Sequence, residues 1–247
     1  VALLRHHPLL EVRETANAIE KTLIKAYPNS FGHKRYEATE TYNEEWMTRD
    51  YYYHDQACPE FKMVSNNVKS ELLNKRILQD RPVKTELPQF MSEAGTLQFE
   101  FLLDFGSFRD IQRHRAVIQR MPLLTIEIGF ENWYLSELPE DVRKNAELLL
   151  DKQEKDIFAL SCEDEEMQYY IPMGYKISNR LTGTLPALVY LVELRFTRFV
   201  HKTLRVKAKM MADSLVEMFC TYGLVLHLDE EPDRFDIKRG THDITVK

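Results

Sequence analysis

The stretch Leu97-Gln98-Phe99-Glu100-Phe101-Leu102-Leu103, followed closely by Phe108-Arg109-Asp110-Ile111-Gln112-Arg113-His114-Arg115, decides the fold of this chain. Its first part is an apolar run typical of a core strand, which we expect over residues 97–104. Its second part carries three arginines and one histidine. Adjacent cationic groups repel one another unless an anion lies among them or all of them reach water. The stretch therefore predicts either an anion site just past a core strand or a solvated helix end, and charge alone leaves both open.

Helix geometry limits how Arg113, His114 and Arg115 could act together. Successive residues of an α-helix are about 100° apart, so Arg113 and Arg115 would diverge by about 200° and could not share a ligand. We expect a helix over residues 107–117, and a joint anion site then requires the chain to leave helical geometry near His114. Asp110 could also pair with Arg113 or His114, which would make part of this charge ordinary ion pairing.

Composition favours a globular protein with one core and argues against a membrane or general nucleic-acid-binding protein. A chain of 247 residues with 44% hydrophobic content can bury one sizeable core. Its 33 basic and 39 acidic residues give a net charge of −6, which argues against general affinity for nucleic acid. Three widely spaced cysteines without a CxxC pair favour a reducing compartment, so we expect a cytoplasmic protein. We expect no membrane span, because no apolar run approaches the ~20 residues that one requires.

Predicted helices and strands follow one another without a regular βαβ alternation. This pattern favours an α+β fold in which a mixed sheet packs with long helices. We expect one domain over residues 1–226 and a poorly ordered tail over 227–247. The connection over 31–60 is expected to be irregular or partly helical. Helices are predicted over 9–27, 61–79, 107–117, 136–160 and 185–221, and strands over 1–4, 97–104, 123–130 and 224–226.

The triplet and the residues ahead of it resemble the signature of flavin-dependent thymidylate synthases, which opens with Arg-His-Arg. A second match, Gln168-Tyr169-Tyr170-Ile171-Pro172-Met173-Gly174, is similar to the family's C-terminal region. Tyr190-Leu191-Val192-Glu193-Leu194-Arg195, followed by His201 and Arg205, is similar to its C-terminal helix. Together these matches cover most of the chain in the family's order.

The resemblance implies an enzyme that binds FAD at the subunit interfaces of a homotetramer. Such an enzyme converts dUMP to dTMP by reductive methylation, with methylenetetrahydrofolate and NADPH as co-substrates. Carried over residue by residue, it implies that Arg113, His114 and Arg115 hold the FAD. It also implies that Arg195, Gln112 and Arg205 contact the nucleotide substrate, and it assigns no metal site.

The second half of the family's signature is absent here. The family's two serines, its Asn-Glu pair and its last arginine fall on Ile118, Leu123, Arg120, Met121 and Thr125. Upstream of the second match, an asparagine and an arginine fall on Thr184 and Pro186. The lost positions mainly hold the nucleotide in that family. An alternative function is therefore a non-catalytic domain of a tandem protein, which would assemble as a dimer where the family forms a tetramer.

Other patterns carry weaker hypotheses. Arg195, Arg198, Lys202, Arg205 and Lys209 would form one basic stripe on a continuous helix, either as a solvated face or as a surface for phosphate, polyanion or protein. The acidic runs 163–166 and 229–231 lack the ordered spacing of a cation loop and are expected to be solvated. The tyrosines of 51–53 could stack a flat ligand, although core or interface packing is commoner. The motifs of dinucleotide folds, P-loop enzymes, zinc proteases and serine hydrolases are missing.

Overall fold

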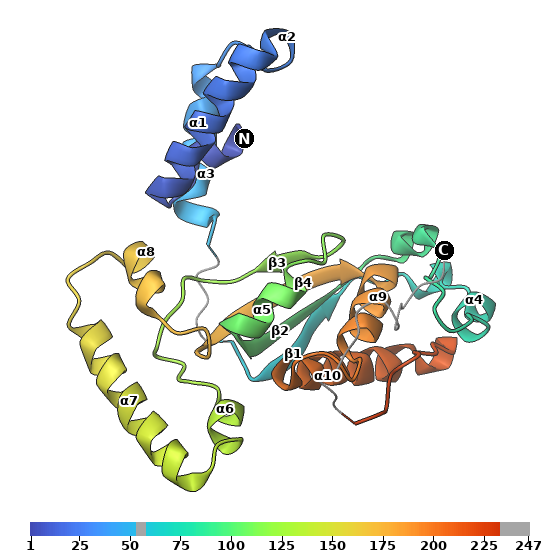
Figure 1. Cartoon of the computed structure of the whole chain (residues 1–247). Helices are drawn as coiled ribbons and strands as arrows, with labels where there is room; N and C mark the ends of the chain where they lie inside the picture. The colour runs from blue at the N-terminus through green and yellow to red at the C-terminus, as the bar shows by residue number, and fades with distance from the viewer. Residues whose placement is uncertain (53–57, 233–247) are drawn as a thin grey trace.

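A computed structural model of the chain describes residues 1–52 and 58–232. Its centre is a four-stranded sheet in the order β1-β2-β4-β3 (Figure 1). All three pairings are antiparallel. The strands are β1 (Phe61–Asn66), β2 (Thr96–Asp104), β3 (Ile118–Arg120) and β4 (Lys176–Thr184).

The strand β2 organises the core, as its sequence predicted. Leu97, Phe99, Phe101 and Leu103 alternate along it, and each is at most 1% exposed. Its whole length pairs with β4, from Thr96 opposite Thr184 to Asp104 opposite Lys176. The expected strand over 97–104 and the α+β class are confirmed.

The helices α9 (Leu185–Arg195) and α10 (Lys202–Phe219) pack against each other and against the sheet. The single helix predicted over 185–221 is therefore wrong, because the chain turns between Arg195 and Lys202. Phe196 and Val200 are both buried within this turn. The backbone N–H of Arg198 donates to the Asp229 carboxylate instead of continuing a helix (2.9 Å). Contacts with a segment distant in sequence thus end the helix where periodicity alone would continue it.

A helical arm formed by α1 (Leu10–Ala26), α2 (Pro28–Phe31) and α3 (Glu37–Asp50) stands away from the sheet (Figure 1). The predicted helix over 9–27 and the partly helical connection are confirmed there, while residues 53–57 lie outside the described part. The strand expected over 1–4 is wrong, because Leu3–His6 forms a 3-10 helix. Arg5 at its end donates to Glu20 (3.0 Å) and Glu40 (2.9 Å), which ties it to the arm.

A second projection consists of α6 (Asn132–Ser136), α7 (Glu140–Phe158) and α8 (Asp164–Met167) (Figure 1). The α7 helix confirms most of the prediction for 136–160. The strand predicted over 123–130 is wrong: this segment is a loop that makes one bridge, from Phe130 to Tyr175. The strand that forms in this part of the chain is β3, directly upstream, which pairs with β4.

The prediction of a helix over 61–79 is also wrong. Residues 61–66 form β1, which pairs with β2 through a register shift between Met63 and Ser65. Only the 3-10 turn Ser70–Leu72 and the short helix α4 (Lys75–Gln79) are helical. The apolar side chains of Phe61 and Met63 pack against the sheet core, so pairing with β2 overrides the local helical spacing.

Residues 224–232, which follow the last helical turn, form neither helix nor strand. The segment 224–226 is not a strand, although the Val225 N–H donates to Leu78 O (3.4 Å). Residues 227–232 are held by side chains of the α9–α10 region, so this part of the expected tail is ordered. The rest of it lies outside the described residues. Within residues 1–52 and 58–232, no helix is long and apolar enough to cross a membrane.

Candidate functional site

The Arg113–Arg115 triplet lies in a turn directly after α5 (Phe105–Ile111). The helix starts where Asp104 accepts a hydrogen bond from the Ser107 N–H (2.9 Å). It ends at Ile111, six residues before the end of the helix predicted over 107–117, so that part of the prediction is wrong. The His114 N–H donates to Ile111 O (2.9 Å), which closes the turn. The geometric condition for the triplet to act as an anion site is therefore met.

The turn separates the three side chains by burial. Arg113 and Arg115 are exposed, whereas His114 is only 8% exposed. The Arg113 guanidinium is 3.7 Å from the Asp110 carboxylate, an exposed pair that contributes little stability. Two guanidinium groups thus reach solvent on either side of a buried ring.

The buried ring of His114 is held by Arg195, the last residue of α9. Arg195 Nε donates to His114 Nε2 (2.8 Å) and its terminal nitrogen donates to Asp110 O (2.6 Å). The Tyr190 ring packs edge-on against the imidazole at 6.0 Å. Because Nε2 accepts, the proton of the neutral ring is assigned to Nδ1. Burial and then the Arg195 charge lower the pKa of His114 to about 4, against a smaller opposing effect of Asp110.

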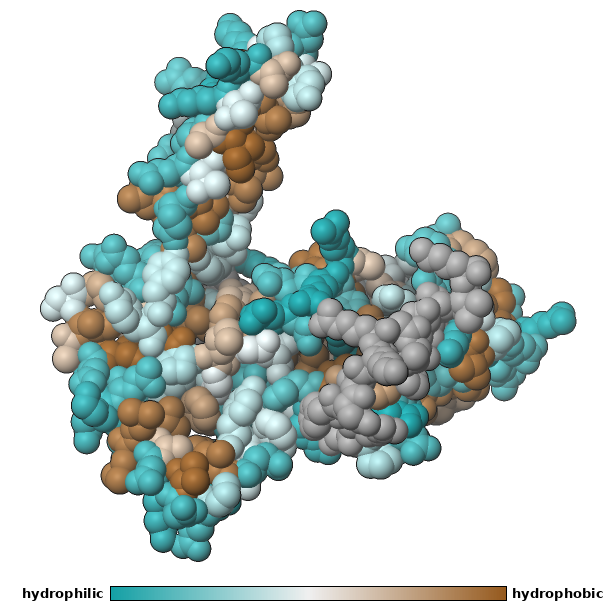
Figure 2. All heavy atoms as spheres, in the orientation of Figure 1, coloured by the Kyte–Doolittle hydropathy of each residue, from teal (hydrophilic) through white to brown (hydrophobic). Residues whose placement is uncertain are grey.

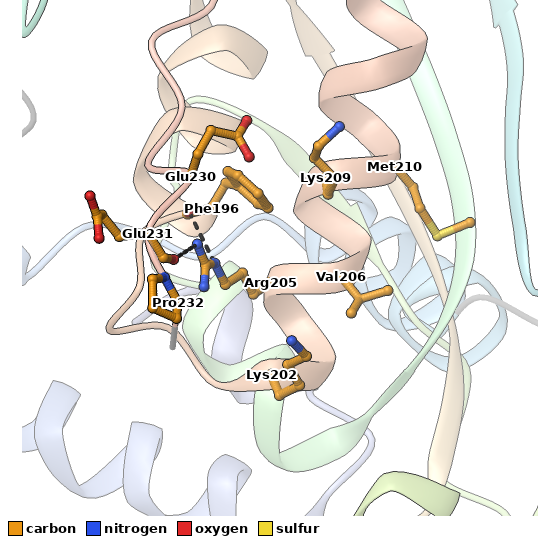
Figure 3. Close-up of a pocket in the computed structure, with 9 residues that line it drawn as sticks. All are labelled: Phe196, Lys202, Arg205, Val206, Lys209, Met210, Glu230, Glu231 and Pro232. Carbon is orange, nitrogen blue, oxygen red and sulfur yellow. Dashed lines mark hydrogen bonds between the residues drawn. The ribbon is translucent and has the colours of Figure 1, made fainter. Parts of the chain in front are cut away.

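The three residues expected to contact a nucleotide occupy different environments. Gln112 is exposed beside the triplet, and Arg195 binds His114 behind it. Arg205 belongs to another region: it is 7% exposed and its guanidinium lies 4.8 Å from the Phe196 ring. It donates to the carbonyl oxygens of Asp229 (2.6 Å) and Glu231 (2.7 Å), which places it against the C-terminal segment (Figure 3).

Arg205 lines a cavity of about 420 Å³ between α10 and residues 230–232 (Figure 3). Lys202 and Lys209 lie on the α10 side of this cavity, and Glu230 and Glu231 lie on the other side. Its walls thus carry both signs of charge. The basic stripe predicted on one helix is divided by the turn after Arg195, and Arg198 pairs with Asp229 (2.7 Å).

The acidic runs hold no recognisable metal site. In the part of the chain that the structure describes, no group of three or more histidine, cysteine or acidic side chains could hold an ion. Asp229 caps and pairs with Arg198, and its hydrogen bonds lower the pKa of its carboxyl group against the opposing effect of burial. The expectation that 229–231 is simply solvated is therefore wrong for Asp229.

A buried polar cluster near the start of α5 was missed by the sequence reading. Ser107 Oγ lies 3.2 Å from His201 Nδ1 and 2.8 Å from Thr203 Oγ1. The Tyr134 hydroxyl donates to the fully buried Asp104 carboxylate (3.0 Å), and its ring stacks on His201 at 5.3 Å. The spacing of Asp104 and Ser107 is a helix-capping pattern, which was the available signal. The cluster joins the start of α5 to α6 and to the start of α10.

The positions that replace the second half of the signature belong to β3 and the loop after it. Ile118 and Arg120 pair with β4, opposite Thr182 and Arg180. Between them, Gln119 donates through Nε2 to Ile111 O (2.8 Å) and His114 O (3.1 Å). These residues therefore hold the triplet turn against the edge of the sheet.

Comparison with known proteins finds uncharacterised relatives. The chain is 29% identical over 132 residues to a "UPF0159 protein" of Chlamydia muridarum and 30% identical over 133 residues to one of Chlamydia pneumoniae. A UPF0159 protein of Thermoplasma acidophilum is 32% identical over 118 residues. The matches cover 53%, 53% and 46% of this chain but only 25%, 25% and 23% of those proteins. The chain thus spans about a quarter of the relatives that it matches.

No family model matches the chain. Among solved structures, a flavin-dependent thymidylate synthase from Helicobacter pylori, crystallised with FAD and dUMP, aligns with a TM-score of 0.41 at 18% identity. The alignment covers 51% of this chain and 70% of that one.

Proposed function

We propose that this chain is a thymidylate synthase-like flavoprotein that holds the diphosphate of FAD at the Arg113–Arg115 turn. The observation that supports the proposal is the end of α5 at Ile111, which frees two exposed guanidinium groups on a short turn. Guanidinium groups bind phosphate oxygens through paired hydrogen bonds, so this turn fits the charge of the cofactor. The motif resemblance supplies the identity of the anion.

In this proposal Arg113 and Arg115 bind the cofactor, and His114 positions the turn. A neutral His114 adds no third positive charge between the two arginines, and Arg195 fixes its ring. Bound flavin would supply the electrons for reductive methylation of dUMP to dTMP, with methylenetetrahydrofolate and NADPH as co-substrates. Gln112 is the exposed candidate for a nucleotide contact. Arg195 would act indirectly, by holding the His114 ring. The assignment of Arg205 to the nucleotide stays a prediction, because its guanidinium binds the C-terminal segment.

We propose further that the chain acts as a homo-oligomer in the cytoplasm, as a tetramer or, within a longer tandem protein, as a dimer. Exposed apolar side chains on the helical arm (α1–α3) and on the second projection (α6–α8) support association. The cysteines are free, which suits a reducing compartment.

Visible absorbance of the purified protein with and without added FAD tests the cofactor assignment. We expect bound flavin in the wild-type protein and its loss after the joint substitutions Arg113→Ala and Arg115→Ala. A hydrogen bond to a charged group contributes about 1.5–3 kcal/mol, so losing both arginines should weaken FAD binding by roughly a hundred-fold. Arg76→Ala, which alters a side chain that is 90% exposed on α4, serves as the matched control. Full flavin retention by the double variant would overturn the assignment.

A second candidate function is a non-catalytic partner domain. The observation that favours it is the structural use of residues 118–120 as a strand, where the family carries nucleotide-binding residues. Calorimetric titration with dUMP separates the two functions. Binding of dUMP by the flavin-loaded protein supports the enzyme, and its absence in a protein that binds FAD supports the partner domain.

A further inference from the structure

The outer end of the N-terminal arm, residues 21–36, is called the arm tip below. It comprises the end of α1, the short helix α2 and the turn that leads into α3, and it lies far from the sheet (Figure 1). It contains four basic side chains and no acidic one: Lys21, Lys25, Lys34 and Arg35. Subtracting this charge of +4 from the net charge of −6 leaves −10 for the rest of the chain. The average charge of the rest of the molecule thus repels a polyanion, whereas the arm tip attracts one.

Three of these four cations are accessible to an external anion. Lys21, Lys25 and Lys34 are exposed and form no ion pair within the described part of the chain. Arg35 differs from them, because it pairs with Glu20. Lys25 lies in the last turn of α1, where a cation also stabilises the helix dipole. That role does not explain Lys34, which lies beyond the end of α2.

The arm tip also holds three aromatic rings in solvent. Tyr27, Phe31 and Tyr36 are 61%, 41% and 63% exposed. The centroids of the Tyr27 and Phe31 rings are 6.5 Å apart, and the Lys34 ammonium lies 5.6 Å from the centroid of the Tyr36 ring. Rings this exposed bury little surface in the fold, so core packing does not account for them. Exposed flat rings beside cations are the features with which proteins bind unpaired bases and their phosphates.

The composition of the arm tip favours nucleic acid over a lipid surface. A helix that lies on a membrane inserts a broad apolar face into the acyl boundary. Between Lys25 and Tyr36 there is no leucine, isoleucine, valine or methionine. Two of the three rings carry a hydroxyl group, so Phe31 is the one wholly apolar ring. This surface therefore offers little apolar area to a membrane but three flat rings for stacking.

We propose that the arm tip binds single-stranded nucleic acid, with bases stacked on its three rings and phosphates contacting its three unpaired lysines. Stacking tolerates any base, so this binding has no marked sequence preference. Phosphate contacts release counterions, so the affinity falls as salt rises. The negative charge of the rest of the chain confines the binding to the arm tip. The site is separate from the Arg113–Arg115 turn and does not require flavin.

Fluorescence anisotropy of a labelled short oligothymidylate, titrated with the whole chain at several salt concentrations, tests the proposal. The logarithm of the binding constant should fall with the logarithm of salt at a slope of about −2, because each of three phosphate contacts contributes roughly −0.7. A blunt duplex should bind more weakly despite its denser charge, because its bases are paired. Equal or tighter binding of the duplex would overturn the proposal. So would sedimentation of the chain with phosphatidylserine vesicles without binding to the oligothymidylate, which would assign the arm tip to a membrane.

Charge variants locate the phosphate contacts. Joint substitution Lys25→Ala and Lys34→Ala should reduce the salt slope to about −0.7, the value for the one contact that remains. The matched control is Lys144→Ala with Lys152→Ala, which removes two exposed lysines from α7 and should leave the slope of about −2 unchanged. The same slope in both double variants would show that the arm tip does not contact the phosphates.

Aromatic variants test the stacking separately. Joint substitution Tyr27→Ala and Phe31→Ala should weaken binding at least roughly ten-fold at an unchanged slope, because stacking releases no counterions. Tyr36→Ala, at the cap of α3, removes a ring outside α2 and serves where the double variant fails to fold. Tyr169→Ala, at a tyrosine that is 64% exposed, is the control and should bind as the wild type does. Full affinity in a folded Tyr27 and Phe31 variant and in Tyr36→Ala would contradict the stacking.

Discussion

At the residue scale, the buried His114 makes stability depend on pH. Its folded pKa of about 4 lies below its ordinary value of 6.5. Between these values the unfolded chain binds more protons, so the free energy of unfolding should rise with pH and fall as pH drops from 6.5 to 4. The effect is on the order of 2 kcal/mol after allowance for partial solvent screening. Urea denaturation across this pH range measures it.

Substitution isolates the histidine from other acid-titrating groups. His114→Gln should flatten the difference between pH 6.5 and 4, whereas the exposed His33→Gln should leave the wild-type slope. Equal slopes for all three proteins would show that His114 is not the neutral buried group that holds the turn.

A second residue-scale prediction concerns the ion pair of Arg81 with Glu193, whose side chains are 3% and 5% exposed. Glu193 also accepts from the His227 N–H (2.7 Å), and Arg81 donates to Val225 O (3.1 Å). Glu193→Gln would leave the Arg81 charge buried without compensation and should destabilise the chain by about 3–5 kcal/mol. The measurement is the urea midpoint at constant m-value.

The exposed pair Arg76–Asp80 provides the control for that measurement. Asp80→Asn should change the free energy of unfolding by less than about 0.5 kcal/mol, because solvent screens the pair. If both substitutions had the same small effect, the buried pair would not be holding the C-terminal segment.

At the scale of elements, the sequence predicts a helix or strand correctly where its conformation depends on neighbouring residues in the chain. The strand β2 could be predicted from the sequence, because Phe99 and Phe101 alternate with polar residues. The strand β1 did not, because Phe61–Asn66 becomes extended only when it pairs with β2. The break after Arg195 was hidden for the same reason: the Asp229 carboxylate that accepts from Arg198 lies 31 residues away.

The candidate site shows the same division between local and distant information. The cluster of positive charge predicted an anion site at Arg113–Arg115. Helix geometry added the condition that the helix must end near His114. Which of the three side chains is buried depends on Arg195, which lies 81 residues from His114. The partners of Arg205 lie 24 and 26 residues downstream, where the sequence suggested only a loose tail.

The contact between β4 and α9 leads to an element-scale prediction at Gly183. A Cβ there would lie 2.7 Å from a Val117 methyl carbon and 3.2 Å from two carbons of Leu188. Gly183→Ala should therefore displace Val117 and the Leu188 side chain of α9, at a cost of about 1–3 kcal/mol. Gly106→Ala, with its nearest contact at 3.4 Å, should be nearly neutral in the same urea titration. Equal stability of the two variants would show that α9 shifts freely on β4.

At the scale of the whole molecule, the two projecting arms leave apolar surface in solvent (Figure 2). Of the α1 residues only Ala16 is buried, and of the α7 residues only Ile157. Leu148 and Leu149 on α7 are 68% and 65% exposed. Helices in water owe most of their stability to packing of an apolar face, so both arms should gain stability by covering theirs. We therefore expect the purified chain to self-associate.

Light scattering coupled to size exclusion, over a range of concentrations, measures this association. Joint replacement of Leu148 and Leu149 by Glu should shift the population toward the monomer, because charge on that face opposes its burial. Val83→Glu, at a residue that is 64% exposed in the loop after α4, should leave the assembly unchanged. If the wild-type chain were monomeric at every concentration, the apolar arms would be covered by another protein or by the remainder of a longer chain. If the wild-type chain does assemble, the α7 variant tests the contact surface, because it loses assembly only where copies of this chain contact one another through that helix.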